Sequence, residues 1–282
     1  MILFKKAADL EACLEKEKKN GCTIGFVPTM GALHQGHISL IEKARQSGDL
    51  TVSSIFVNPT QFNDQKDFEH YPSTIEKDID LLEAAGCDIL FLPSVQEIYP
   101  AGTMQLPHYD LGYLETILEG KFRPGHFQGV CQVVDRLLKI VRPARLYLGQ
   151  KDYQQCMVIS KLAELTNSST KIIICPTLRE PGGLAMSSRN MRLDDEQKKQ
   201  AEKISQALLF IREEIKPGPL QALKEKAVSL LSDAGFKADY VEIADASTLE
   251  PKKEWDGKTK LVALAAAFLG EVRLIDNMII NA

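Results

Sequence analysis

The sequence has no long hydrophobic run and no excess of positive charge. Its longest apolar stretch, residues 261–269, has nine residues, whereas a membrane-spanning helix needs about twenty. The N-terminal residues lack the basic and then apolar layout of a signal peptide. The chain carries 34 Lys and Arg against 38 Asp and Glu, whereas charge-driven binding of nucleic acid needs clustered cations. We therefore expect a cytoplasmic protein that binds neither a membrane nor nucleic acid.

Disulfide and metal-binding patterns are also missing. The six cysteines form no Cys-x-x-Cys pair and have no metal-ligand spacing. We expect them to be small buried hydrophobic side chains in a reducing compartment. The chain has 282 residues, of which 44% are hydrophobic and 26% charged, and this is enough for one large or two ordinary domains.

The first 175 residues alternate between two kinds of segment. Short runs rich in β-branched and aromatic residues predict strands at 23–27, 51–57, 88–92, 144–148 and 171–175. Longer segments with helical periodicity predict helices at 38–46, 74–85, 129–141 and 153–165. This alternation is typical of an α/β domain with a Rossmann-like parallel sheet, in which ligands bind at the carboxyl ends of the strands.

The pattern changes beyond Cys175. A loop at 176–190 leads to a long charged helix from about residue 194, and a second helix ends at Ala234. Strand-like runs follow at 238–243, 260–269 and 272–275. This order predicts a smaller α+β domain with a mostly antiparallel sheet. We expect domains at 1–175 and 176–282, with the active site between them.

The strongest motif is Met30-Gly31-Ala32-Leu33-His34-Gln35-Gly36-His37, which follows a predicted strand and opens a helix. Free backbone amides and the positive end of the helix dipole favour an anion there. Together with the imidazole groups of His34 and His37, they predict a polyphosphate site. The alternative is that both histidines only cap and pack the first turn. A zinc site is disfavoured because no third ligand stands at a recognisable spacing.

Three other loops carry polar side chains. In the first, Pro59 stiffens the exit from a strand and holds Asn58 and Gln61 as short amide arms, which suit a small hydroxy acid. The alternative is an ordinary polar turn. In the second, Lys151 offers a point charge to phosphate and Asp152 can accept from ribose hydroxyls, unless Asp152 only caps a helix.

The third loop, residues 184–190, brings two hydroxyls and a guanidinium, from Ser187, Ser188 and Arg189. These groups suit phosphates, and a glycine-rich loop of this kind can close over a reactive intermediate and exclude water. The alternative is a loop that only caps a helix.

These motifs carry a family resemblance. His34-Gln35-Gly36-His37 resembles the HIGH signature of the nucleotidylyltransferase and class I aminoacyl-tRNA synthetase superfamily, and Met186-Ser187-Ser188-Arg189 resembles its KMSKS loop. The surrounding sequence closely resembles the pantoate–β-alanine ligase family at residues 28–37, 56–62, 123–130, 149–155 and 184–190. Two positions depart from the family pattern: Gly182 stands at a usually acidic position and Ser73 at a usually basic one.

The resemblance implies a two-step ligase reaction of coenzyme A biosynthesis. ATP and (R)-pantoate form pantoyl adenylate and pyrophosphate, and β-alanine then attacks to give pantothenate and AMP. Mg²⁺ is expected with ATP because it shields the triphosphate and needs few protein ligands. Asp78 is a possible contact, although we expect a carboxylate on the helix surface. The family also suggests a homodimer formed through the N-terminal domain, and a C-terminal domain that acts as a lid.

The resemblance further implies the roles of single residues. Gln61 and Gln155 are expected to bind pantoate, with Asn58 and Phe62 beside them. The catalytic groups are expected to be His34, His37, Lys151 and Arg189, with His37 as proton donor. Arg123 and His126 are secondary candidates for the pocket. The expected ATP site comprises Met30, Gly31, Ala32, Leu33, His34, Gln35, Gly36, His37, Gly149, Gln150, Lys151, Asp152, Leu178, Met186, Ser187, Ser188 and Arg189.

Three other functions are alternatives to the ligase reaction. An adenylyltransferase would join AMP to a phosphate acceptor and stop, but Asn58 and Gln61 argue against it because a phosphate acceptor favours basic residues. A non-catalytic nucleotide sensor would bind ATP without turnover. A tRNA synthetase would need a basic anticodon module, for which this acidic chain has no obvious candidate.

Overall fold

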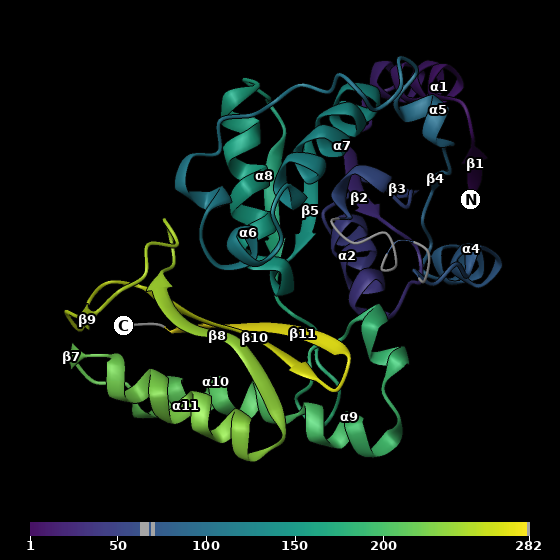
Figure 1. Ribbon diagram of the computed structural model, residues 1–282. Coiled ribbons are helices and arrows are strands. Elements are labelled where there is room, and N and C mark those ends of the chain that lie inside the picture. Colours follow the sequence, from purple (N-terminus) through teal and green to yellow (C-terminus); the bar gives the residue numbers. More distant parts are fainter. Residues whose placement is uncertain (63–67, 69–70, 281–282) are drawn as a thin grey trace. The chain divides into compact units, whose positions relative to one another are not determined.

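Residues 1–62, 68 and 71–280 are described by a computed structural model, in which the chain forms two units (Figure 1). The first unit comprises Met1–Gly149 and Gln155–Pro176. The second comprises Gln150–Gln154 and Thr177–Ala282, so a short segment near the middle of the chain groups with the C-terminal residues. The domain assignment made from the sequence stays a prediction.

Within the described residues, the first unit contains a six-stranded parallel sheet in the order β1-β4-β3-β2-β5-β6. The Rossmann-like α/β class is confirmed, and the five predicted strands are present with ends shifted by at most two residues. The strands are β1 (Ile2–Phe4), β2 (Ile24–Thr29), β3 (Leu50–Ile55), β4 (Ile89–Phe91), β5 (Arg145–Gly149) and β6 (Lys171–Cys175).

Helices and 3-10 turns connect these strands. Two helices begin three residues earlier than predicted, because His34 caps one and the left-handed Gly125 (φ 79°) precedes the other. The elements are α1 (Ala7–Lys19), α2 (Gln35–Gln46), η1 (Pro59–Gln61), α4 (Ile75–Ala84), α5 (Val95–Ile98), η2 (Gly112–Glu115), α6 (Leu118–Phe122), α7 (His126–Val141) and α8 (Tyr153–Leu165).

The N-terminal elements β1 and α1 were not predicted. Helix α1 buries only Leu10 and Leu14 completely, so its apolar periodicity is weak. The helix packs against α7. This tertiary contact stabilises a helix that its weak apolar periodicity does not predict.

Both faces of the parallel sheet are buried. Val27 and Leu90 belong to an apolar cluster with residues of α2 and α4. Phe26 and Phe91 are their neighbours along the strands and point to the opposite face, where they are fully buried. Burial on both faces is expected for a parallel sheet with helical crossovers.

Helix α7 passes very close to the turn η1. Gly129 lies against Thr60 and Gln61, and a Cβ added to this glycine would overlap the carbonyl oxygen of Thr60. The missing side chain therefore lets the helix approach the turn at backbone distance.

Within the described residues, the second unit contains a three-stranded antiparallel sheet in the order β11-β10-β8 and a short pair, β7-β9. The predicted α+β class with an antiparallel sheet is confirmed. The elements are η3 (Gln150–Asp152), η4 (Ser188–Arg192), α9 (Asp195–Ala201), α10 (Lys203–Glu214), β7 (Gly218–Pro219), α11 (Gln221–Asp233), β8 (Phe236–Asp245), β9 (Glu254–Trp255), β10 (Leu261–Leu269) and β11 (Val272–Ile280).

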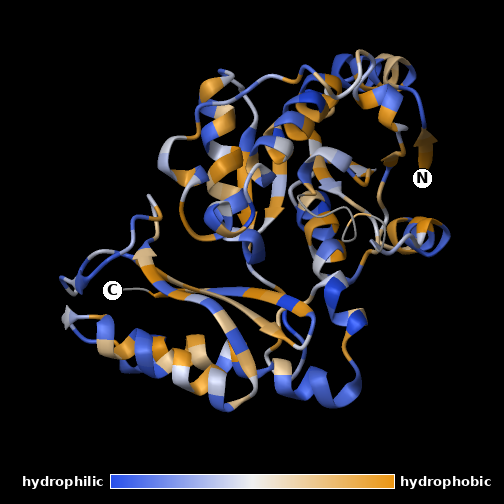
Figure 2. Ribbon diagram, viewed as in Figure 1, coloured by the Kyte–Doolittle hydropathy of each residue, from blue (hydrophilic) through white to orange (hydrophobic). Residues whose placement is uncertain are grey.

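The nine-residue apolar run forms β10, the central strand of this sheet. Its alanines Ala263, Ala265 and Ala267 belong to the core cluster with residues of α10 and α11. Hydrophobic and hydrophilic residues alternate along α11 (Figure 2), as expected for a helix with one face on a core. The long charged helix predicted from residue 194 is two helices, α9 and α10, which meet at Glu202.

No helix among the described residues is both long and apolar enough to cross a membrane.

None of the six cysteines, all of which lie in the described part of the chain, forms a disulfide, and four of them are buried as predicted. Cys13 and Cys22 differ, because they are only partly buried. Burial raises the pKa of Cys87 and of Cys131 to about 12, so both stay protonated thiols that pack as small hydrophobic groups.

The packing of α7 on η1 predicts that Gly129→Ala destabilises the protein. The added methyl group would overlap backbone atoms of the turn, and overpacking of this kind costs about 1–3 kcal/mol. Urea unfolding measures the loss. The matched control is Gly149→Ala, because nothing lies within 4 Å of a Cβ added there. Equal unfolding midpoints for the two variants would contradict the close approach.

Candidate active site

The turn between β2 and α2 carries the strongest sequence motif. Thr29 Oγ1 donates to the Ser54 carbonyl at 2.7 Å and accepts from the Gly31 amide at 3.2 Å. The backbone then passes through two positive φ angles, 82° at Gly31 and 49° at Ala32. A left-handed conformation is strained for alanine, so the turn needs support from elsewhere in the chain.

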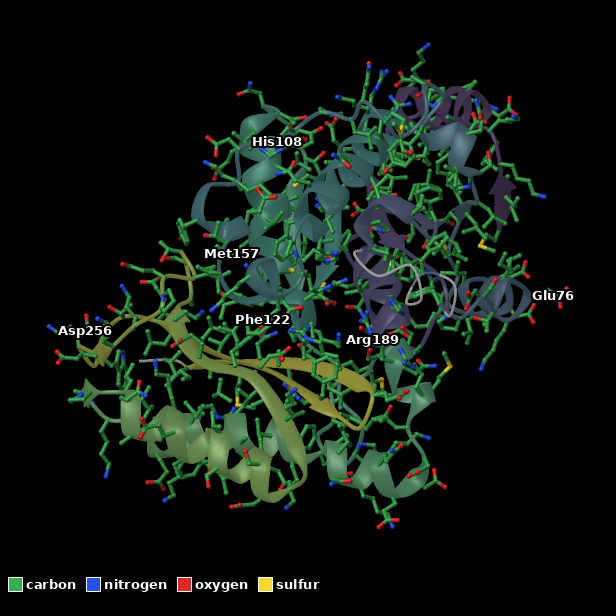
Figure 3. The ribbon with its side chains drawn as sticks, in the orientation of Figure 1. Glu76, His108, Phe122, Met157, Arg189 and Asp256 are labelled. Carbon is green, nitrogen blue, oxygen red and sulfur yellow. The ribbon has the colours of Figure 1, made fainter. Side chains whose placement is uncertain are left out.

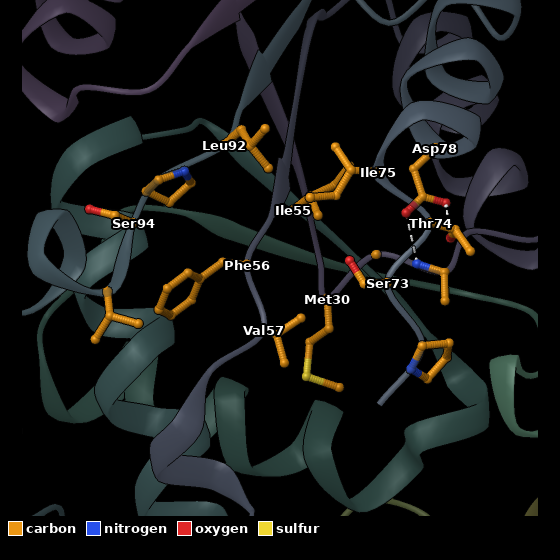
Figure 4. Close-up of a pocket in the computed structure, with 15 residues that line it drawn as sticks. Met30, Ile55, Phe56, Val57, Ser73, Thr74, Ile75, Asp78, Leu92 and Ser94 are labelled. Atoms are coloured by element: carbon orange, nitrogen blue, oxygen red, sulfur yellow. Dashed lines mark hydrogen bonds between the residues drawn. The ribbon is translucent and has the colours of Figure 1, made fainter. Parts of the chain in front are cut away.

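Asp78 of α4 supplies that support (Figure 4). Its Oδ2 accepts from the Ala32 amide at 2.9 Å, and its Oδ1 accepts from the Leu33 amide at 2.8 Å. The Thr74 hydroxyl also donates to Oδ1, at 3.1 Å. Asp78 is only 1% exposed, so the expected helix-surface carboxylate was wrong: this side of α4 faces the β2–α2 turn. A contact between Asp78 and Mg²⁺ stays a prediction.

His34 and His37 form a reciprocal cap at the start of α2. His34 Nδ1 accepts from the Gly36 amide at 3.1 Å, and His37 Nδ1 accepts from the His34 amide at 3.3 Å. A ring nitrogen that accepts a hydrogen bond carries no proton, so each neutral imidazole holds its proton on Nε2. The capping alternative is therefore observed, and it uses one nitrogen of each ring.

Most backbone amides of this turn already have acceptors, contrary to the expectation that they are free for an anion. The Asp78 carboxylate accepts hydrogen bonds from the N–H groups of Ala32 and Leu33. Imidazole nitrogens accept those from the N–H groups of His34 and Gly36. The amide of His37 donates to the His34 carbonyl. A phosphate at this helix start would therefore meet the imidazole groups rather than these amides.

Asn58, which follows β3 and caps η1, holds Gln61. Its Nδ2 donates to Gln61 Oε1 at 3.2 Å and to the Gly129 carbonyl at 3.1 Å, while its Oδ1 accepts from the Tyr99 hydroxyl at 2.9 Å. Burial raises the pKa of Tyr99, which keeps that hydroxyl a donor. Asn58 is 1% exposed and positions Gln61. Its direct contact with a substrate stays a prediction.

Gln61 connects this turn to the first motif. Its Nε2 donates to Met30 Sδ at 2.7 Å, and His126 Nδ1 lies 2.8 Å from its backbone carbonyl. A carbonyl oxygen only accepts, so His126 carries its proton on Nδ1, and Arg123 Nη1 donates to its Nε2 at 3.0 Å. Arg123 and His126 thus support the Gln61 backbone. Sequence reasoning singled out their segment but missed this role.

A pocket of about 250 Å³ lies beside the carboxyl ends of β2 and β3 (Figure 4). Its wall is mostly apolar and includes Met30, Phe56 and Val57. Ser73, one of the two departures from the family pattern, also lines it, as does Asp78.

The remaining pantoate candidates lie in the first unit. The Phe62 ring packs edge-on against Phe68 and Tyr71, with centroid distances of 5.3 and 5.7 Å. Gln155 is partly exposed in the first turn of α8. Their contacts with a substrate stay predictions.

In the second unit, the turn η3 carries the candidates Gln150, Lys151 and Asp152. Lys151 Nζ lies 3.7 Å from Asp152 Oδ1. Asn277 of β11 donates its Nδ2 to the carbonyls of Gln150 and Lys151, both at 2.9 Å. The preceding Gly149 ends β5, and a Cβ added there would meet open space.

The KMSKS-like loop lies in the same unit. The Met186 amide donates to the Leu178 carbonyl at 3.0 Å. Ser187 Oγ accepts from the Arg189 amide at 3.3 Å and so caps η4, on which Figure 3 labels Arg189. The capping alternative is observed for Ser187, whereas phosphate contacts of this loop, including those of Ser188, stay predictions.

Gly182, the other departure from the family pattern, lies against Glu202. A Cβ added at position 182 would overlap the Glu202 carboxylate. An acidic side chain there would also meet a like charge, which repels it. Glycine at position 182 therefore avoids both the steric overlap and the charge repulsion with Glu202.

No group of three or more His, Cys, Asp or Glu side chains within residues 1–62, 68 and 71–280 is arranged to hold a metal ion.

The support of the β2–α2 turn predicts that Asp78→Asn destabilises the protein. The substituted amide offers one acceptor where the carboxylate offers two, so a buried backbone donor loses its partner at a cost of about 1–3 kcal/mol. Thermal and urea unfolding measure this loss. Asp80→Asn is the matched control, because Asp80 is exposed on the same helix. A loss no larger than that of the control would refute the supporting role of Asp78.

Comparison with known proteins places these features in one family. Residues 2–279 match the family model described as pantoate-beta-alanine ligase. The pantothenate synthetase of Acetivibrio thermocellus is 46% identical over 284 residues and covers 100% of both chains. The crystal structure of pantothenate synthetase from Thermus thermophilus has 38% identity, full coverage of both chains and a TM-score of 0.88.

A second solved structure agrees. The pantoate-beta-alanine ligase of Francisella tularensis, complexed with beta-gamma ATP and beta-alanine, is 40% identical and covers 99% of this chain and 97% of its own, with a TM-score of 0.82. The family match spans nearly the whole chain and includes both units. The chain therefore belongs to the pantoate–β-alanine ligase family.

Proposed function

We propose that this chain joins (R)-pantoate to β-alanine in two steps. The pantoate carboxylate attacks the α-phosphorus of ATP to give pantoyl adenylate and pyrophosphate. The β-alanine amine then attacks the acyl carbon and displaces AMP. A carboxylate is a poor electrophile, and its linkage to AMP provides a good leaving group. Family membership supports this reaction, and the Francisella complex with beta-gamma ATP and beta-alanine supports two of its substrates.

The observation that carries the proposal is the reciprocal cap of His34 and His37. Capping occupies Nδ1 of each ring, so Nε2–H is the donor that each imidazole offers. Two preorganised donors at a helix start stabilise the charge that develops on the phosphates as pyrophosphate leaves. In this step His37 donates a hydrogen bond from Nε2–H to the leaving pyrophosphate.

The second unit contributes the cationic and hydroxyl groups. Lys151 provides a point charge, and Arg189 provides a planar donor that can contact two phosphate oxygens. Ser187 and Ser188 add hydroxyl donors. Mg²⁺ arrives with ATP, since this ion is commonly held by substrate phosphates with few protein ligands, and it shields the triphosphate charge.

Pantoate is recognised by neutral amides. Gln61 Nε2 donates to a methionine sulfur, which is a weak acceptor. A pantoate hydroxyl or carboxylate is a stronger acceptor, and this donor can exchange to it at little cost. Gln155 provides the second amide. Phe62 and the apolar pocket beside Met30 suit the dimethyl carbon of pantoate.

The proposal also covers the oligomeric state of the protein and the role of its second unit. We infer a cytoplasmic homodimer, formed through the first unit, in which the second unit acts as a lid that excludes water from the adenylate. Light scattering or sedimentation measures the mass in solution, and a monomer would remove this part of the proposal.

His37→Ala is expected to lower pantoate-dependent pyrophosphate release about 10²–10³-fold, because one preorganised donor is lost. Circular dichroism shows whether the variant is folded. The matched control is His108→Ala, because His108 is exposed and carries no motif (Figure 3). Near-normal pyrophosphate release from a folded His37→Ala would eliminate the assigned role.

The overall reaction is tested with ATP, Mg²⁺, pantoate and β-alanine, with each substrate omitted in turn and the products identified by mass spectrometry. We expect AMP and pantothenate only when all are present. An AMP adduct that accumulates without any dependence on an amine would favour an adenylyltransferase. Bound but unchanged ATP would favour a nucleotide sensor, and ADP would rule out adenylation.

A further inference from the structure

Two adjacent polar side chains are buried in the edge strand of the second unit. Asp276 and Asn277 of β11 are each 2% exposed. The strand pairs with β10, and it also contacts η3 and η4. Buried polar groups are costly unless they form hydrogen bonds, so the partners of these two residues indicate what they do.

Asn277 holds the turn that carries Lys151. Its Nδ2 group donates to two successive carbonyl oxygens, those of Gln150 and Lys151, with N···O distances of 2.9 Å each. Its Oδ1 accepts from Gln150 Nε2 at 3.1 Å. Both N–H donors and the carbonyl oxygen of one buried amide are therefore engaged with η3, and they define both the position and the direction of this turn.

Asp276 holds the other loop through Arg179. The Arg179 guanidinium contacts both carboxylate oxygens, with Nη1 to Oδ2 at 2.6 Å and Nη2 to Oδ1 at 2.9 Å. The same guanidinium donates to the Gly183 carbonyl at 2.9 Å and to the Asn277 carbonyl at 3.2 Å. Burial raises the pKa of Asp276, and the Arg179 guanidinium opposes this shift.

Arg179 also lies on a hairpin that leads to the KMSKS-like loop. It forms an antiparallel bridge with Ala185, and the Met186 amide donates to the Leu178 carbonyl at 3.0 Å. The carboxylate of Asp276 thus reaches, through one guanidinium, the strand-like segment that ends just before Ser187.

We propose that Asp276 and Asn277 are positioning residues for adenylate formation. Being adjacent on one strand, they hold the Lys151 turn and the segment before Ser187 and Arg189 at a constant spacing. A displacement of about 1 Å in groups of this kind can lower the rate about 10²-fold. The inference rests on the function proposed above, and it assigns to β11 a role in that reaction without contact with the substrates.

The test is pantoate-dependent exchange of pyrophosphate into ATP by full-length Asn277→Ala. We expect an exchange rate about ten- to a hundredfold lower and a raised KM for ATP. The KM for pantoate should be nearly unchanged, since the residues proposed to bind it, Gln61 and Gln155, lie in the first unit. A purely structural role would lower the melting temperature and leave the KM for ATP of the folded protein unchanged.

The matched control is Asp239→Asn. Asp239 of β8 pairs with Arg273 of β11, with Oδ2 at 2.7 Å from Nε, so the variant removes the negative charge of an ion pair in the same sheet that involves neither loop. We expect wild-type exchange kinetics. Wild-type kinetics in Asn277→Ala as well would overturn the positioning role while leaving the proposed function intact.

A second variant, Arg179→Lys, decides the result if Asn277→Ala does not fold. Lysine keeps the positive charge beside Asp276 but lacks the fork that also reaches the Gly183 carbonyl. The same selective rise in the KM for ATP is expected, and an unchanged value would overturn the inference. Absence of pantoate-dependent exchange in both wild type and Asp239→Asn would instead refute the proposed function, and this inference with it.

Discussion

The carboxylate of Asp78 is the constraint on which the first motif depends. It accepts two backbone N–H groups from a turn that includes the left-handed Ala32, and that turn ends at His34, the N-cap of α2. Without the carboxylate, buried donors would lose their acceptor and a strained backbone would lose its support. A residue 46 positions further along the chain than Ala32 thus supports the turn that leads to both histidines.

Two buried asparagines also support neighbouring residues through hydrogen bonds. Asn58 uses its amide to hold Gln61, and Asn277 uses its amide to hold the turn with Lys151. In both cases a neutral group that donates and accepts hydrogen bonds supports a neighbour that is proposed to contact a substrate. An amide can donate and accept at once and carries no charge, so it can be buried at lower cost than an ionised side chain.

Hydrogen bonds also select the tautomer of three histidines. Backbone amides donate to Nδ1 of His34 and His37, whereas His126 donates from Nδ1 to a carbonyl and accepts from Arg123 at Nε2. The first two are therefore suited to donate from Nε2, and the third is suited to support Gln61. For a reaction that relies on positioning and charge stabilisation, this orientation is the chain's main contribution.

The sequence by itself determined the main strands of both units except β1, several of the helices between them and the motifs that follow the strands, because hydrophobic periodicity and loop chemistry are local properties. The same argument located His34, His37 and Gln61. Tertiary structure alone decided the supporting contacts within each unit: the burial of Asp78 and the approach of α7 at Gly129 in the first, and the two loops held by β11 in the second. These contacts join residues far apart in the chain, and packing, which no local pattern encodes, brings them together.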